Sequence, residues 1–380
     1  MRRLVLASAG AGKSRLIVKQ SLRRINLGEK VLILTYTEKN QEELVKKFCK
    51  LCSFVPAAVT IKGWFSFLLE DVIRPYQTCL FQDRIPGINF NSVDPHKKNG
   101  RNIPGRGENY NGNYNPIHFL TIKEGRAHTT YISKLAVRVV SLTGGKPILR
   151  LCEIYQTACI DEVQDLIGWD FEIIRAISKS CIGKFSCVGD FRQTLYSTHP
   201  TTKNPKTNNE KLERFRDFGF RVQQLSVSWR CIQKILDLAD LVHKGDDIYD
   251  PTVSRLGRID PDFADHLGVF VVKQDEVSAY LEKYQPIILR NNKITQKELC
   301  DGRKVFNFGE AKGMEFNRVL ICATDKHKAF LAGKKRVFDS DRTDKAKNTL
   351  YVAITRAKFS VAFLCDGDIG LEGVEVWSSS

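Results

Sequence analysis

The sequence has no long hydrophobic run. No apolar stretch reaches the ~18 residues that a membrane-spanning helix needs, which excludes an integral membrane protein. The apolar residues after Met1 are few and lead directly into Gly12-Lys13-Ser14, so we do not interpret them as an export signal. We therefore expect a cytoplasmic protein with no membrane partner.

Zinc ligands in a recognisable pattern are also missing. Cys49 and Cys52 form a CxxC pair, but no second pair follows at ligand spacing, which argues against a zinc site. Most of the 11 cysteines lie in apolar runs, as in residues 158–160 and 320–322, which is typical of reduced thiols in a core. No nuclease motif is evident, so any cleavage would require a partner protein.

What is present is a large, positively charged folded chain. Its 380 residues are enough for two or three domains. Hydrophobic residues make up 42% and charged residues 27% of the sequence, a composition that excludes a disordered chain. Lys and Arg total 59 against 43 Asp and Glu, a net charge of +16. Such an excess favours a polyanionic partner, with nucleic acid first and an anionic membrane surface second.

Short apolar runs alternate with helical patterns along the chain. A helix is expected from Lys13, and apolar residues from Leu44 to Leu51 recur at helical spacing. This alternation predicts α/β architecture with parallel sheets, in which ligands bind at the carboxyl ends of the strands. The expected strands are residues 4–6, 31–34, 157–160, 185–188, 287–289, 319–322 and 361–364.

Two segments interrupt the alternation. Residues 88–117 are rich in Asn and Gly and are predicted to form a long loop. They belong to a longer stretch, 76–149, in which ten Lys and Arg residues oppose four Asp and Glu. A solvated surface and a nucleic-acid-binding face are both compatible with this charge. Residues 200–209 form a second loop, near a domain boundary.

The segment Ala7–Ser14 reads ASAGAGKS, between an expected strand and an expected helix. This is the context of a phosphate-binding loop, whose backbone N–H groups and helix N-terminus form an anion cradle. Lys13 would reach the β- and γ-phosphates, and the Ser14 hydroxyl would ligate Mg²⁺. Ala7 stands where such loops usually have their first glycine. The cradle comprises Ser8, Ala9, Gly10, Ala11, Gly12, Lys13 and Ser14.

An acidic segment, Asp161-Glu162-Val163-Gln164-Asp165, follows the expected strand 157–160. Asp161 would hold Mg²⁺, and Glu162 would polarise the attacking water of a phosphoryl-transfer reaction. An exposed acidic turn is the alternative, which the accompanying phosphate loop disfavours.

Together with five further segments, these two resemble the motif set of the UvrD/Rep/PcrA group of superfamily-one DNA helicases. The resemblance implies two RecA-like P-loop NTPase domains with parallel sheets, ATP bound in the cleft between them, and one small insertion. The implied domains are 1–75 with 150–222, the basic insertion 76–149, and 223–380. The further segments are residues 34–40, 188–196, 225–231, 311–316 and 351–358.

The resemblance also assigns site residues. Gln193 would sense the γ-phosphate, and Arg230 and Arg356 would be arginine fingers that neutralise its charge. Arg15 and Trp229 would sandwich the adenine, although Trp229 could instead belong to a core. Glu315 would contact the ribose.

The same resemblance implies contacts with single-stranded DNA. The residues concerned are Thr35, Tyr36, Lys62, Trp64 and Tyr196. Each of the three aromatic rings could equally well pack in a core. Relatives place a further stacking aromatic where this chain has Thr198, so one platform, worth ~1–3 kcal/mol per base, is lost.

Length is the largest departure from the helicase pattern. Arg230 and Lys312 are 82 residues apart, which leaves no room for the big inserted domain that relatives carry there. The predicted function is an ATP- and Mg²⁺-dependent DNA helicase/translocase of the UvrD/Rep type that hydrolyses ATP to move on single-stranded DNA. The missing domain argues against duplex unwinding by this chain alone. The alternative is an ATPase subunit that senses DNA or nucleotides and regulates a partner nuclease, as in bacterial antiphage systems such as Gabija.

Overall fold

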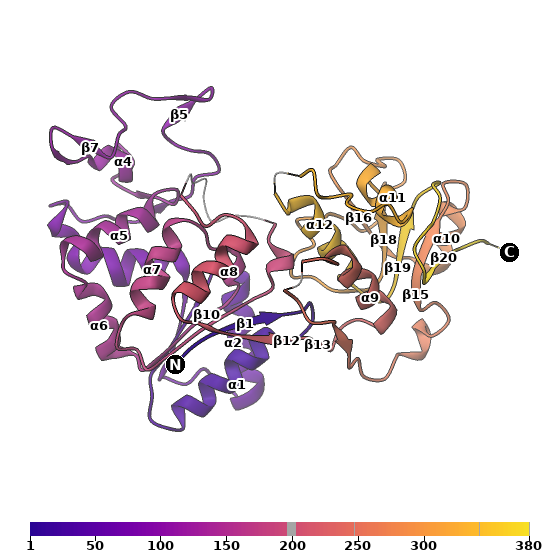
Figure 1. Cartoon of the computed structure of the whole chain (residues 1–380), viewed down its shortest axis with the longest axis horizontal. Helices are drawn as coiled ribbons and strands as arrows, with labels where there is room; N and C mark the ends of the chain where they lie inside the picture. The colour runs from indigo at the N-terminus through magenta and orange to yellow at the C-terminus, as the bar shows by residue number, and fades with distance from the viewer. Residues whose placement is uncertain (196–202, 247, 342, 380) are drawn as a thin grey trace. The chain divides into compact units, whose positions relative to one another are not determined.

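The computed structural model describes residues 1–195, 203–246, 248–341 and 343–379, and contacts divide them into two units. Unit 1 comprises Met1–Val5, Lys13–Gly189 and residues 203–223. Unit 2 comprises Leu6–Gly12, Asp190–Leu195 and the described residues from Gln224 onward. The chain forms two six-stranded sheets, one for each unit (Figure 1).

The first sheet has the strand order β12-β1-β11-β10-β2-β3. Its strands are β1 (Arg2–Ala7), β2 (Val31–Thr35), β3 (Val59–Gly63), β10 (Thr157–Ile160), β11 (Lys184–Gly189) and β12 (Arg221–Leu225). β10 pairs in parallel with β2 and β11, and β2 pairs in parallel with β3. Every residue of β2 and β10 is buried, as expected for parallel strands covered on both faces.

Helices connect these strands on opposite faces. The connection from β2 to β3 runs across the sheet in one direction and that from β10 to β11 runs in the other, so right-handed crossovers place their helices on different faces. The helices are α1 (Lys13–Ile25), α2 (Glu38–Cys52), α5 (Ile132–Leu142), α6 (Lys146–Ile154), α7 (Trp169–Ser178) and α8 (Asn208–Asp217). Helix α2 begins where the Thr37 hydroxyl accepts from the Asn40 N–H at 3.2 Å, an N-cap.

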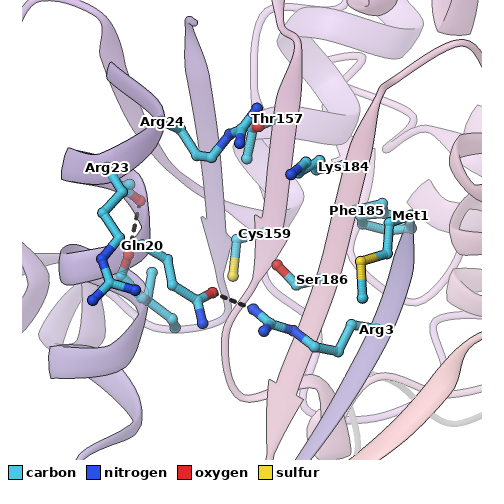
Figure 2. Close-up of a pocket in the computed structure, with 12 residues that line it drawn as sticks. Met1, Arg3, Gln20, Arg23, Arg24, Thr157, Cys159, Lys184, Phe185 and Ser186 are labelled. Atoms are coloured by element: carbon cyan, nitrogen blue, oxygen red, sulfur yellow. Dashed lines mark hydrogen bonds between the residues drawn. The ribbon is translucent and has the colours of Figure 1, made fainter. Parts of the chain in front are cut away.

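Part of the first sheet is polar on the face beneath α1. There Arg3, Cys159 and Ser186, from three different strands, face the helix residue Gln20 (Figure 2). Apolar side chains usually fill such a helix–sheet interface, so this polar patch departs from an ordinary core.

The segment between β3 and α5 contains small elements only. They are α3 (Trp64–Phe67), a π-helical turn (Leu68–Ile73), a 3₁₀ helix (Arg74–Cys79), β4 (Ile88–Asn89), β5 (Lys97–Lys98), β6 (Arg101–Asn102), β7 (Asn109–Tyr110), β8 (Asn113–Tyr114), α4 (Pro116–Phe119) and β9 (Ala127–His128). Figure 1 shows β5, β7 and α4 gathered at one end of unit 1. The prediction of a long loop at 88–117 was wrong in part, because this segment contains two antiparallel hairpins, β5–β6 and β7–β8. Their turns, Asn99-Gly100 and Asn111-Gly112, have positive φ at both residues, the pattern that Asn-Gly hairpin turns favour.

The second sheet has the order β17-β16-β18-β19-β15-β20, and all its pairs are parallel. Its strands are β15 (Gly268–Val272), β16 (Ile287–Arg290), β17 (Val305–Asn307), β18 (Phe316–Cys322), β19 (Ala357–Leu364) and β20 (Val374–Val376). The other elements of unit 2 are β13 (Val227–Ser228), β14 (Val253–Ser254), a 3₁₀ helix (Pro261–Phe263), α9 (Gln233–Val242), α10 (Val277–Tyr284), α11 (Asp325–Leu331) and α12 (Lys345–Ile354).

Alternation along these strands builds two cores. Val319 and Ile321 of β18 pack with α9, α11 and α12, whereas Leu320 between them packs with α10 on the other face. Successive side chains of a strand point to opposite faces of the sheet, and both faces of this sheet are covered, so consecutive buried residues such as these must be apolar. Ala9, from the glycine-rich loop, belongs to the first of these cores.

The predicted α/β class with parallel sheets is confirmed, and the arrangement is consistent with two RecA-like domains. Each of the seven expected strands is present. Among the described residues, no helix is long and apolar enough to cross a membrane.

Candidate nucleotide site and nucleic-acid residues

The glycine-rich loop connects β1 to α1. Gly10 and Gly12 adopt φ of +71° and +79°, a region that favours glycine. Gly10 also meets a close neighbour, because a Cβ built there would lie 2.5 Å from the Cβ of Arg230. Helix α1 begins at Lys13, so its first N–H groups and the loop offer the donors of an anion cradle.

Lys13 lies beside the acidic segment that follows β10. Its Nζ is 2.9 Å from Oε1 of Glu162, and both side chains are mostly buried. Glu162 has a φ of +54°, a left-handed conformation that is uncommon for a residue with a Cβ and is typical of functional turns. The Ser14 hydroxyl, one residue further along α1, donates to Glu43 at 3.2 Å.

Asp161 is the most buried carboxylate of this group, with 3% of its surface exposed. Burial, and then the negative charge of Glu162, raise the pKa of Asp161 above its usual range, while Lys13 opposes the shift. Its Oδ1 accepts from the Glu162 N–H at 2.9 Å. A cation brought to this carboxylate would therefore relieve an unfavourable burial of charge.

The donor set of unit 1 fits Mg²⁺. The Ser14 hydroxyl and the Asp161 carboxylate supply oxygen ligands, which this hard cation prefers. Among the described residues, no cluster of three or more His, Cys, Asp or Glu side chains could hold a metal ion. Proteins bind Mg²⁺ through one or two carboxylates together with substrate phosphates.

Gln164 holds the acidic turn against the neighbouring strand. Its Nε2 donates to Glu162, and its side chain fills the space beside Gly189, where a Cβ would lie 2.4 Å from Gln164 Oε1. Only glycine allows β11 to end this close to the turn. No role for Gln164 followed from the sequence.

Unit 2 brings together the two predicted arginine fingers with Gln193 and Glu315. Arg230 Nε donates to Glu315 at 3.0 Å, and Lys358 binds the same carboxylate at 3.1 Å. Arg356 Nη2 donates to Gln193 Oε1 at 3.4 Å. These four residues, distant in sequence, thus meet in one place.

Arg356 is a fully buried cation held by backbone carbonyls. Its guanidinium donates to Met314 O at 2.9 Å and to Val352 O at 3.1 Å. Burial, and then the positive charge of Arg230, lower the pKa of Arg356 to about 9, so it stays protonated at neutral pH. Two like charges near one another favour an anion between them.

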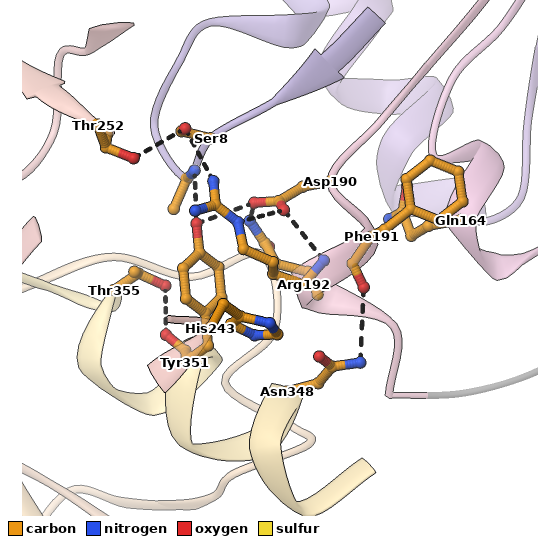
Figure 3. A network of polar contacts seen from close by, with 12 residues as sticks. Ser8, Gln164, Asp190, Phe191, Arg192, His243, Thr252, Asn348, Tyr351 and Thr355 are labelled. Atoms are coloured by element: carbon orange, nitrogen blue, oxygen red, sulfur yellow. Dashed lines mark hydrogen bonds and ion pairs between the residues drawn. The ribbon is translucent and has the colours of Figure 1, made fainter. Parts of the chain in front are cut away.

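A buried polar network, missed by sequence reasoning, anchors the loop within unit 2 (Figure 3). Arg192, 2% exposed, donates to Ser8 Oγ at 2.8 Å and to Asp240 at 2.9 Å. Tyr351 accepts from the Ala9 N–H and donates to Asp190, each at 3.2 Å. The partners come from widely separated segments, so no local motif reveals them.

The remaining predicted cofactor residues are Arg15, Ala11 and Trp229. Arg15 is exposed on α1, and Ala11 is buried in the loop. Trp229 is 57% exposed, which removes the alternative that it belongs to a core. Its N–H donates to Gly10 O at 3.0 Å, so its backbone adjoins the loop.

Three predicted nucleic-acid residues lie near the carboxyl ends of β2 and β3. Thr35 is buried, and its hydroxyl has no hydrogen-bond partner among the described residues. Tyr36 is half-buried and meets Phe65 edge-on at 5.7 Å; burial first, and then Asp165 and Asp170, raise its pKa to about 12. Lys62 pairs with Asp71 at 2.7 Å and with Glu70 at 3.1 Å.

Trp64 departs from its predicted role. It is 1% exposed, and its indole N–H donates to the buried Asp170 at 2.8 Å. A ring with no exposed face has no room for a nucleic-acid base, so the structure places Trp64 in the core instead. Tyr196, the other predicted platform of this kind, lies outside the described residues.

Comparisons with known proteins agree with this geometry at the start of the chain. Residues 1–78 match the family model of the UvrD/REP helicase N-terminal domain. The match covers about a fifth of the chain and makes this segment similar to the N-terminal domain of those helicases. No curated protein matches the chain.

Among solved structures, the chain is similar to arterivirus nonstructural protein 10, a helicase, in complex with DNA. The sequence identity is 13% and the TM-score 0.44. The similarity covers 96% of this chain and 60% of that helicase, so this chain spans less than two thirds of its length.

Proposed function

We propose that the chain is an ATP-dependent translocase of the UvrD type that moves on single-stranded DNA. The observation that carries the proposal is the position of Lys13 and Glu162, 2.9 Å apart, at the end of a glycine-rich loop. The match of residues 1–78 to a helicase domain supports the same conclusion. We retain the predicted cytoplasmic location and the predicted domain borders as part of this proposal.

Each residue has a chemical task. Lys13 and the loop N–H groups would bind the β- and γ-phosphates, and Glu162 would orient the attacking water and accept its proton. Gln193 would sense the γ-phosphate, and Arg230 and Arg356 would neutralise the charge that spreads over its oxygens. The Lys13–Glu162 ion pair must separate for Lys13 to bind phosphate, which frees the carboxylate to act as a base.

The residues that would hold Mg²⁺ are Ser14 and Asp161. When bound, the ion would neutralise phosphate charge as a Lewis acid. The Glu43 carboxylate would have to release the Ser14 hydroxyl, a hydrogen bond of 3.2 Å that is exposed and therefore weak.

Aromatic and basic residues of unit 1 favour a single strand as the partner. Tyr36 contacts Phe65, and Phe65 contacts Phe90 at 6.2 Å, a ring that is 77% exposed. The β5–β6 hairpin exposes Lys97, Lys98 and Arg101. Exposed rings can stack with bases and exposed cations can bind phosphate, and both are features of sequence-tolerant single-strand binding.

Two substitutions test the catalytic assignment. Lys13→Ala and Glu162→Gln should each lower the ATP turnover number at least about 100-fold, because they remove phosphate binding and water activation. Lys19→Ala, on the same helix, and Glu42→Gln, on α2, are exposed matched controls that should leave turnover unchanged. Normal turnover in Lys13→Ala or Glu162→Gln would contradict the assignment.

A second candidate function is a DNA- or nucleotide-sensing ATPase subunit that regulates a partner nuclease in antiphage defence. One observation favours it: the described residues between Arg230 and Lys312 build α9, α10 and strands of unit 2, with no additional domain. The two functions differ in their response to DNA. A translocase hydrolyses ATP faster on single strands without help, whereas a regulatory subunit needs its partner.

A further inference from the structure

A cavity of about 250 Å³ lies between α1 and the amino ends of β1, β10 and β11. It is in unit 1, at the opposite ends of the strands from Lys13 and Asp161. The wall of the cavity extends toward that site as far as Ile17 and Cys159, but Arg23 is ten residues after Lys13, about 15 Å along the axis of α1. The cavity is therefore distinct from the candidate nucleotide site.

The cavity has an unbalanced positive charge. Arg3, Arg23, Arg24 and Lys184 line it, and among the described residues no Asp or Glu does. Arg24 is neutralised by an ion pair with Glu29. The ion pairs of the described residues do not include Arg3, Arg23 or Lys184. Three cations without carboxylate partners thus surround one small space.

The floor of the cavity offers neutral hydrogen-bonding groups. Arg3 donates to Gln20 Oε1, and Figure 2 shows these two side chains pointing toward one another near Cys159 and Ser186. Ile17 and Phe185 form an apolar part of the cavity wall.

We propose that this cavity binds a small phosphate ester. Guanidinium groups bind phosphate through paired hydrogen bonds, and Arg3 and Arg23 approach the space from a strand and a helix. The volume limits the ligand to about the size of a sugar phosphate, since drug-sized ligands need roughly 300 Å³ or more. This proposal gives a function, ligand binding, to the polar residues beneath α1, which a closed core would not contain.

The site is suited to regulation rather than chemistry. β1 and α1, which line the cavity, are also the two elements that flank the glycine-rich loop. Binding that holds Arg3 and Arg23 together would stiffen both elements at their far ends. This connects the cavity to the loop through two continuous secondary-structure elements.

The test is calorimetric titration of the full chain with ribose 5-phosphate, using ribose as the uncharged counterpart. Every protein carries Lys13→Ala, which removes the cation of the glycine-rich loop, so the result is independent of the function proposed above. Arg23 is exposed, so Arg23→Gln leaves the fold intact. This variant should bind ribose 5-phosphate at least about tenfold more weakly, because it loses one charged hydrogen bond. Lys184→Gln, on β11, is a second variant with the same expectation.

Lys19→Gln is the matched control, because it removes one exposed charge from the same helix but does not line the cavity. It should change the affinity less than about twofold, as a distant screened charge does. The proposal is overturned if ribose 5-phosphate does not bind saturably, if ribose binds equally well, or if Lys19→Gln weakens binding as much as Arg23→Gln.

Discussion

Arg192 offers the sharpest prediction about what holds unit 2 together. Its side chain is 2% exposed and binds Ser8, Asp190 and Asp240, with the Asp190 contact at 3.3 Å. The guanidinium also lies 4.6 Å from the ring centre of Tyr351. Arg192→Met keeps much of the volume but removes every one of these interactions.

The expected cost follows from the carboxylates that remain. Asp190 is fully buried, and Asp240 is mostly buried, so each would lose its cation in a medium that solvates charge poorly. Removing one partner of a buried ion pair costs about 3–5 kcal/mol of unfolding free energy. The free energy of unfolding of a domain is about 5–15 kcal/mol in total, so the variant should be close to unfolding.

Urea unfolding followed by circular dichroism measures this cost. Arg336→Met is the matched control, because the Arg336–Asp339 ion pair is 3.7 Å long and exposed, and its loss should cost less than about 1 kcal/mol. Adding Asp240→Asn to Arg192→Met should recover part of the loss by removing an unpaired charge. The reasoning is refuted if Arg192→Met costs no more than Arg336→Met.

Three further predictions concern pH, the loop and nucleic acid. His327 is 3% exposed, and burial lowers its pKa to about 4. Because the unfolded chain binds this proton from pH 6.5 downward, the free energy of unfolding should decrease as the pH falls from 6.5 to 4. Urea unfolding at pH 6.5 and 5 should show that His327→Met reduces this decrease by up to about 1.4 kcal/mol per pH unit. Gly10→Ala should lower ATP turnover at least about tenfold while circular dichroism stays native, because a Cβ would collide with Arg230; unchanged turnover would disprove the close approach. Affinity for a labelled single-stranded oligonucleotide should fall at least about 100-fold between 50 and 200 mM salt in an anisotropy titration, and a flat response would argue against backbone binding.

Sequence patterns predicted seven of the twelve strands of the two sheets, and they predicted the glycine-rich loop. The run VLIL at 31–34 is apolar throughout, the pattern of a strand that is buried on both faces. Gly-Lys-Ser between a strand and a helix predicted the loop with equal directness. In both cases the signal is local, because backbone geometry at neighbouring residues produces it.

Burial of single side chains and long-range contacts could not be predicted in this way. A core position was an open alternative for both Trp64 and Trp229 in the sequence, yet the first is in the core and the second is exposed. The contacts of Arg192 join segments near residues 8, 190, 240 and 351, and no pattern in one sequence pairs such segments. The cavity beneath α1 is of the same kind, because its polar residues come from three strands and a helix.

Steady-state ATP hydrolysis by the purified chain, with and without single-stranded DNA, duplex DNA and RNA, tests the central claim most directly. The account predicts basal hydrolysis that single-stranded DNA stimulates strongly and that Glu162→Gln abolishes. Absence of hydrolysis under all four conditions, or hydrolysis that survives Glu162→Gln, would contradict it.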